Sequence, residues 1–365
     1  NGIMSSNSFK FNESDYTSDN MKLELKSKDP KKLAFMAKNV KGRMDMKSQK
    51  GSFESNDKTL MNDFDYNNYM TSMDKIDWNF KDSTLALSCT KKLKDTYFIS
   101  KHKFQDSLSF NAKTSFYDMK TSILKVEGVP YISIADAHVY PDKNILFIRP
   151  NAAMDTLKNA VVKADTVSFF HNVYSSDIKI NSKYRMGGFG TYDYINKTKK
   201  PQKVFFNKLR TKQMLDGYSP EDKIYETLAD GVIEEEQKFE LNPKLGFKGN
   251  VFLYAPEKFL TFEGYSKVYL DNPGINTQWF SFKDLIDPDS LFISIDKPKN
   301  ENERPLHIGF FFRGAGLKDI YFRFLDTKLN EEQHEIFTVD GLLQLDELSG
   351  IVSVGDQRKI QEGAL

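Results

Sequence analysis

The chain has a single cysteine, Cys89, among its 365 residues. One cysteine cannot form an intramolecular disulfide, and it excludes every zinc or iron–sulfur centre that needs several thiolates. Histidine is scarce as well, because the five histidines are scattered and none has a partner at a short metal-binding spacing. We therefore expect no cofactor, and we interpret Cys89, which lies beside an apolar alternating stretch, as a small buried hydrophobic residue.

An excess of charge of one sign is also missing. The chain carries 52 basic and 51 acidic residues, which gives a net charge of +1. This balance offers no electrostatic surface to nucleic acid, so we predict no nucleic-acid partner. No stretch approaches the roughly 20 apolar residues that a helix needs to cross a bilayer, which predicts that the chain has no transmembrane helix.

Aromatic residues are abundant instead, with 30 Phe and 17 Tyr. Apolar and polar residues alternate with a period of two, which is typical of half-buried β-strands. Ile76, Trp78 and Phe80 share one face, residues 81–83 turn the chain, and residues 84–88 return it as the second strand of a hairpin. We predict further hairpins at 123–139, 131–148 and 250–265, and further strands at 178–182, 306–313, 319–325 and 342–354.

These patterns predict an all-β fold of mainly antiparallel hairpins, arranged as an elongated sheet, a sandwich or a solenoid-like array, with very little helix. Short helical turns are expected only after Asp155, at 156–159, and at 220–222. The ambiguous stretch 224–233 is assigned to a strand. We divide the chain into segments 1–120, 121–298 and 299–365, or read it as one continuous elongated domain.

Residues 131–150, YISIADAHVYPDKNILFIRP, contain the strongest candidate for a metal site. In a continuous strand Asp136 and His138 share a face, about 7 Å apart along the strand. That spacing permits a shared metal ion, but a zinc site takes three or four protein ligands. We interpret the pair as an Asp–His contact beside a turn at 141–144. Asp136 and His138 remain weak metal candidates, and we assign no catalytic or cofactor-binding residue.

Three other motifs have a functional and a structural interpretation. The GGFG motif at 187–190 lacks the lysine and Ser/Thr of a phosphate-binding loop, so we expect a bulge or a close approach of strands there. The acidic stretches 234–236 and 287–290 lack the ligand spacing of a calcium loop and favour solvated turns. The aromatic runs 310–312 and 321–324 either line a sugar- or lipid-binding groove or belong to the core.

Four phrases together resemble an interior segment of very large exported proteins of the Bacteroidota. The phrases lie at 27–46, 131–142, 188–206 and 239–268. The resemblance implies a cell-envelope location and a longer parent chain, and it implies no activity and no site residues. It agrees with the start of the sequence, which has neither a Met at position 1 nor an apolar signal region and which we expect to be cut from a longer chain.

Three functions are compatible with the sequence. The first is a non-enzymatic scaffold whose partners are envelope proteins or other parts of the same long chain. The second is a β-groove that handles lipid or lipopolysaccharide, which requires an uncovered apolar sheet face. The third is a glycan-binding or glycan-active module, in which carboxylates from distant strands would converge. The sequence favours the scaffold, because it contains many hairpins and no catalytic motif.

Overall fold

The computed structural model describes residues 2–197, 199–214, 224–288, 292–312, 319–328, 334–345 and 351–355. Over these residues the all-β prediction is confirmed, since the strands pair in antiparallel fashion and each helical segment is a single three-residue 3-10 turn. These turns are η1 (Asp65–Asn67), η2 (Leu93–Asp95), η3 (Asp142–Asn144), η4 (Pro150–Ala152) and η5 (Glu235–Gln237). No helix within the described ranges is both long enough and apolar enough to cross a membrane.

The chain forms two compact units. Unit 1 comprises Asn1–Gly190 and Lys208–Leu228, and unit 2 comprises Thr191–Asn207 and Ala229–Leu365. The segment limits predicted at 120 and 298 are not limits of these units, and they stay predictions.

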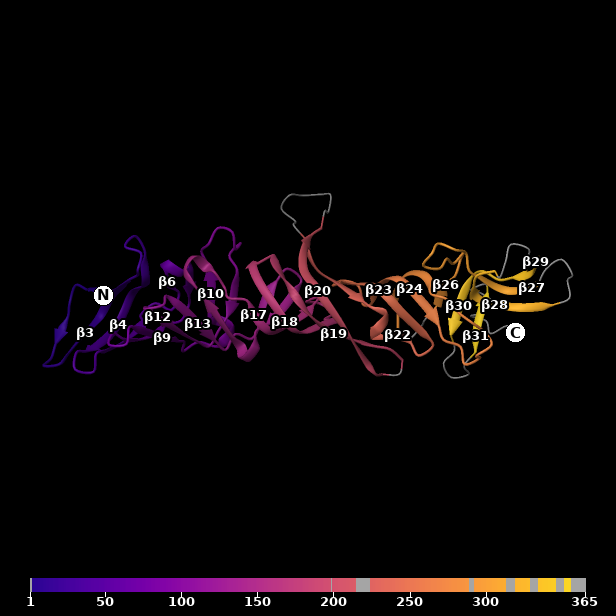
Figure 1. Ribbon diagram of the computed structural model, residues 1–365. Helices are drawn as coiled ribbons and strands as arrows, with labels where there is room; N and C mark the ends of the chain where they lie inside the picture. The colour runs from indigo at the N-terminus through magenta and orange to yellow at the C-terminus, as the bar shows by residue number, and fades with distance from the viewer. Residues whose placement is uncertain are drawn as a thin grey trace. The chain divides into compact units, whose positions relative to one another are not determined.

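Unit 1 contains two series of paired strands that diverge at β4 (Leu33–Asp45), and successive strands occupy successive positions along the unit (Figure 1). Residues 40–45 of β4 pair with β5, whereas Met36 pairs with β6. The first sheet contains β1 (Gly2–Ser5), β2 (Lys10–Phe11), β3 (Asp15–Lys26), β4, β5 (Lys50–Ser55), β8 (Lys75–Asn79), β9 (Thr84–Ser88), β12 (Thr114–Asp118), β13 (Ile123–Glu127) and β16 (Ile145–Ile148). The second sheet contains β6 (Asn62–Phe64), β7 (Tyr69–Thr71), β10 (Tyr97–Ser100), β11 (Ser109–Asn111), β14 (Ile132–Ile134), β15 (Ala137–Tyr140), β17 (Leu157–Ala164) and β18 (His171–Ser182).

The core of unit 1 lies between these two sheets. Phe64 of the second sheet meets Tyr117 of the first with ring centroids 5.3 Å apart, and Phe35 packs on Phe64 at 5.0 Å. These three side chains have no exposed surface. The alternation seen in the sequence therefore places one face of most strands in a shared core and the other face outside, whereas β1 and β2 contain no buried residue.

Consecutive strands often belong to different sheets, whereas the sequence predicts that they pair as hairpins. The hairpins at 76–88 and 250–265 are confirmed as β8–β9 and β23–β24. The hairpins predicted at 123–139 and 131–148 are wrong, because β13 pairs with β16 and β15 pairs with β14 and β17. Alternation shows that a strand has a buried face, but a strand that folds back and one that crosses to the opposite sheet have the same pattern.

Unit 2 contains further antiparallel strands. β22 (Phe239–Asn242), β23 (Leu245–Tyr254), β24 (Leu260–Val268) and β25 (Phe280–Ile286) pair in chain order. Two three-stranded sheets follow, formed by β26 (Phe292–Ser294), β30 (Leu342–Leu345) and β31 (Val352–Gly355), and by β28 (Ile320–Asp326), β27 (His307–Phe312) and β29 (His334–Thr338).

Three long strands contribute residues to both units. They are β19 (Arg185–Ile195), β20 (Pro201–Gln213) and β21 (Tyr225–Ile233). β21 confirms the strand predicted at 224–233, whereas the helical turn predicted at 156–159 is wrong because β17 begins at Leu157. The turn predicted at 220–222 lies outside the described residues, as do Asp289 and Ser290 of the second acidic stretch.

Candidate functional site

The predicted metal candidates lie on a tight hairpin and not on one strand. Ile134 pairs with Ala137, so the chain reverses at Ala135 and Asp136 between β14 and β15. Asp136 is therefore a turn residue, whereas His138 is on the returning strand opposite Ser133. The prediction that both share the face of a continuous strand is wrong.

Asp136 anchors this turn to another part of unit 1. Its Oδ1 accepts hydrogen bonds from the backbone N–H of Thr227 at 2.9 Å and from the Thr227 hydroxyl at 2.6 Å. The N–H of the preceding Ala135 donates to the carbonyl of Lys183 at 2.9 Å. Burial raises the pKa of Asp136 above its ordinary value, although the hydrogen bonds from Thr227 lower it.

His138 belongs to an aromatic cluster on the outer side of the second sheet. Its ring stacks on Tyr131 with a centroid separation of 4.1 Å and lies 5.6 Å from the ring of Phe169. Burial lowers the pKa of His138, which favours the neutral ring. Over the described ranges, no group of three or more His, Cys, Asp or Glu side chains is placed to hold a metal ion. The contacts of Asp136 and His138 therefore match a structural role for each residue.

At the GGFG motif the structure shows the second of the two predicted alternatives, a close approach of strands. A Cβ atom at Gly188 would come within 1.9 Å of the Asp177 carbonyl oxygen, and one at Gly190 within 2.2 Å of the Ser176 hydroxyl. These glycines let β19 approach β18 closely. Cys89 differs from its prediction, because it is half-buried and its thiol lies 3.9 Å from the carbonyl oxygen of Ser72.

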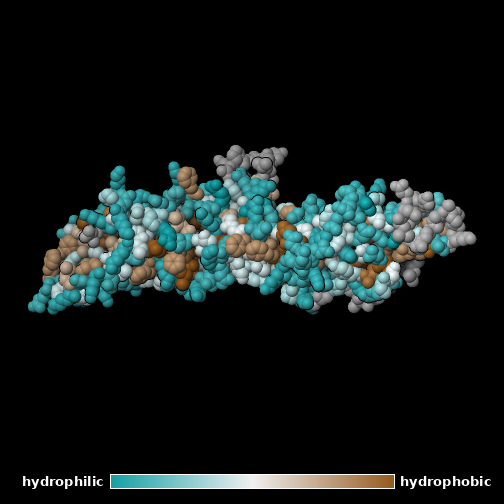
Figure 2. Space-filling view, in the orientation of Figure 1, coloured by the Kyte–Doolittle hydropathy of each residue, from teal (hydrophilic) through white to brown (hydrophobic). Residues whose placement is uncertain are grey.

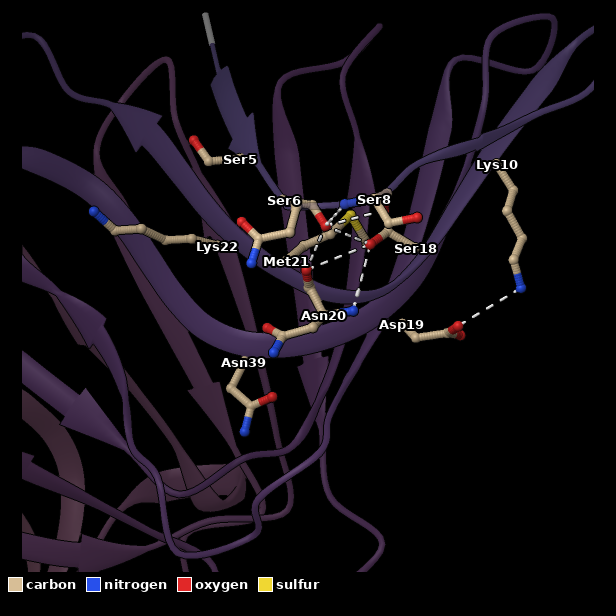
Figure 3. Close-up of a pocket in the computed structure, with 11 residues that line it drawn as sticks. Ser5, Ser6, Ser8, Lys10, Ser18, Asp19, Asn20, Met21, Lys22 and Asn39 are labelled. Atoms are coloured by element: carbon tan, nitrogen blue, oxygen red, sulfur yellow. Dashed lines mark hydrogen bonds and ion pairs between the residues drawn. The ribbon is translucent and has the colours of Figure 1, made fainter.

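A hollow of about 390 Å³ lies beside β3, and Ser5, Ser6, Ser8, Ser18 and Asn20 are among the residues that line it. In Figure 3 the side chains of Ser6 and Ser18 point toward each other, and their hydroxyl oxygens are 2.8 Å apart. The Ser6 hydroxyl also donates to the carbonyl of Asn20 at 2.6 Å. These polar groups bind one another and the main chain, so this hollow resembles a hydrogen-bonded strand junction more than a ligand site.

A second hollow, in unit 2, has a different lining. We name it the Trp279 hollow; its volume is about 400 Å³, and it is lined by Glu235, Lys238, Phe239, Glu240, Phe247, Lys267, Tyr269 and Trp279. Phe239 and Phe247 are buried, whereas Tyr269 is 40% exposed and Trp279 is half-buried. Aromatic rings and charged groups therefore meet at one accessible depression.

The sequence did not reveal the Trp279 hollow. Its side chains come from η5, β22, β23, the end of β24 and the segment before β25, and these are separated in the chain. The only available signal was Trp279 itself, one of two tryptophans, in a stretch that lacks strand alternation. The predicted aromatic runs are mixed in character, since Phe311 is completely buried while Phe310 is 46% exposed.

On the face drawn in Figure 2, hydrophobic residues lie in separate groups between hydrophilic ones. Comparison of the chain with protein-family models, with curated proteins and with solved structures gives no match.

Proposed function

We propose that the chain is a non-enzymatic structural segment of a cell-envelope protein. The observation that supports this proposal best is that buried amide side chains in unit 1 donate hydrogen bonds to main-chain carbonyls. Asn67 has no exposed surface, and its Nδ2 donates to the carbonyls of Ser122 at 3.0 Å and Ile148 at 3.2 Å. Asn62 and Gln105 donate in the same way to the carbonyls of Met73 and Ala152, at 2.7 and 2.8 Å. These amide groups bind the main chain and hold the architecture together.

The packed core favours a scaffold and argues against a lipid-handling groove. The inner faces of the two sheets of unit 1 cover each other, and the rings of Phe64 and Tyr117 meet between them. A groove for acyl chains needs an apolar face that remains uncovered. The envelope location rests on the resemblance of the sequence, and the proposed partners are envelope proteins or other parts of a longer chain.

Genetics in the native host tests this role. A scaffold loses function when its fold is lost, whereas an enzyme loses function when one reacting group is replaced in an intact fold. We expect deletion of the segment to make the cells sensitive to detergent, and the double variant Asn67→Ala/Tyr117→Ala to have the same effect. We expect the conservative variants Asp136→Asn and His138→Gln to keep the resistance of the wild type.

Cell fractionation tests the location in the same strains. The proposal predicts that the segment is recovered with the envelope fraction. Recovery in the cytosol would contradict it, and so would a conservative variant that melts no lower than the wild type and still reproduces the effect of the deletion.

A further inference from the structure

We infer that the Trp279 hollow binds carbohydrate, and specifically a neutral oligosaccharide. This inference goes beyond the scaffold role, because it assigns a ligand-binding site to unit 2. It rests on two accessible aromatic side chains that the structure holds in place and on a lining whose charges cancel. The volume of about 400 Å³ lies within the range of small-molecule sites.

Tyr269 provides the first aromatic surface. Its ring lies against the backbone at Gly246, where a Cβ atom would come within 2.4 Å of the tyrosine hydroxyl and 2.9 Å of two ring carbons. Only glycine at 246 lets the ring lie this close to β23. Tyr269 is 40% exposed even though its ring lies against the strand beneath it. An exposed aromatic ring with a fixed position can stack on a sugar without first losing side-chain entropy.

Trp279 provides the second aromatic surface, and two contacts orient it. Its indole N–H donates to Glu235 Oε1 at 3.3 Å, and the ammonium group of Lys248 lies 4.6 Å from the ring centroid. Lys248 is itself paired with Glu235 at 2.7 Å and Glu301 at 2.6 Å. Lys248 does not line the hollow, whereas Trp279 does. The indole is therefore oriented by Lys248 from outside the hollow and by Glu235 at its wall, while the half-buried ring remains available to a ligand.

The charged groups of the lining favour a neutral polyhydroxyl ligand. Glu235 and Glu240 offer acceptors, and Lys238 and Lys267 offer donors. Two carboxylates and two ammonium groups sum to zero, so the hollow has no net attraction for a phosphate or another anion. An acyl chain would remove charged groups from water without binding them. Sugar hydroxyls both donate and accept, and the C–H groups of a pyranose face match the negative face of an aromatic ring.

The protonation states match this ligand class. Hydrogen bonding from Lys248 holds the pKa of Glu235 below its ordinary value, so Glu235 is an ionised acceptor at neutral pH. Burial, together with the nearby Glu240 and Glu235 carboxylates, raises the pKa of Tyr269 and keeps its hydroxyl as a donor. Acceptors and a donor therefore lie beside the two rings.

The two tryptophans allow a direct test. The other tryptophan, Trp78, is only 6% exposed and lies in unit 1. Because the chain has two tryptophans, the fluorescence of the variant Trp78→Phe comes from Trp279 alone. The probes are soluble hexasaccharides of β-1,4-glucose, β-1,3-glucose, α-1,4-glucose and β-1,4-mannose, with inorganic phosphate as the anionic control. We expect at least one hexasaccharide to change the Trp279 fluorescence saturably and to protect it from acrylamide quenching, and we expect phosphate to do neither.

Variants locate the binding. In isothermal titration, Trp279→Ala and Tyr269→Ala are each expected to weaken the affinity for the same hexasaccharide at least about tenfold, and Glu240→Gln severalfold. The matched control is Tyr97→Ala, which removes a similarly exposed tyrosine from unit 1. Tyr269→Ala keeps the test decisive if Trp279→Ala fails to fold. Absence of a saturable response to all four sugars would overturn the inference, and so would unchanged affinity in a folded Tyr269→Ala variant.

Discussion

Asn67 joins the two sheets of unit 1 through a single amide group. It lies in η1, between two strands of the second sheet. Its Nδ2 donates to the carbonyl of Ser122, between β12 and β13 of the first sheet, and to that of Ile148 in β16 of the same sheet. Without this donor, two buried carbonyl groups lose a partner in a region that excludes water. The residue is therefore more important for stability than its size suggests.

Replacement of Asn67 by alanine tests this point. We expect Asn67→Ala to lower the free energy of unfolding by about 2 to 4 kcal/mol, because two buried acceptors lose a donor. Asn172→Ala is the matched control, since Asn172 is exposed on β18 and its replacement should change stability by less than about 0.5 kcal/mol. Urea unfolding of both variants measures the difference, and equal stabilities would contradict the role given to Asn67.

The raised pKa of Asp136 predicts that this carboxyl group lowers the stability of the fold as the pH rises. Its folded-state pKa lies above the ordinary value of 3.8. Ionisation of Asp136 therefore costs stability, and this cost is absent below 3.8 and appears as the pH rises through the folded pKa. Asp136→Asn keeps an oxygen that can accept from Thr227 and removes the charge. We expect this variant to melt at a higher temperature than the wild type at pH 7, with the difference vanishing near pH 3.

Asp165 is the control for this prediction because its pKa shifts in the opposite direction. Burial raises the pKa of Asp165, but hydrogen bonds from Ser168 and Val167 outweigh burial and leave it below the ordinary value. Its ionised form contributes stability that is lost as the pH falls through the folded pKa. Asp165→Asn should therefore melt lower than the wild type at pH 7. The same sign for both variants at pH 7 would contradict the two assignments.

At the scale of elements, the turn between β14 and β15 contains a residue in an unfavourable conformation. Ala135 has a φ of +53°, in the left-handed region, which glycine adopts without a steric penalty. We expect Ala135→Gly to raise the free energy of unfolding by about 1 kcal/mol. Ala137→Gly, in the adjacent strand, should lower it by about 1 kcal/mol, because glycine weakens a strand interior. Urea unfolding gives the free energies of unfolding of both variants. A loss of stability in Ala135→Gly would show that the backbone conformation of Ala135 does not destabilise the turn.

The same turn explains why part of the fold could be predicted and part could not. Residues 76–88 form the predicted hairpin because their turn is polar and their strands pair locally. Ala135 and Asp136 lack the Asn-Gly or Asp-Gly sequence of a two-residue turn, so the sequence continues to alternate through them without a turn signal. Asp136 then binds Thr227, which is 91 positions away in the chain. Periodicity reveals buried faces, but it cannot identify partners at such separations.

At the scale of the whole molecule, the chain passes between the two units inside strands. The limits at 190/191, 207/208 and 228/229 fall within β19, β20 and β21. A loop linker would let each unit unfold without the other, whereas unfolding of one unit removes the neighbours of one end of each shared strand and lets the strand fray toward the other unit. Neighbouring parts of a β-array are coupled in this way. We therefore expect the units to unfold together.

Trp78 in unit 1 and Trp279 in unit 2 report separately on this coupling. In the single-tryptophan variants Trp78→Phe and Trp279→Phe, we expect fluorescence to give the same urea midpoint. Addition of Asn67→Ala, which removes contacts only within unit 1, should lower both midpoints together, because shared strands transmit the loss. If Asn67→Ala lowers the Trp78 midpoint and leaves the Trp279 midpoint unchanged, the units unfold independently, and β19, β20 and β21 connect them without coupling their stability.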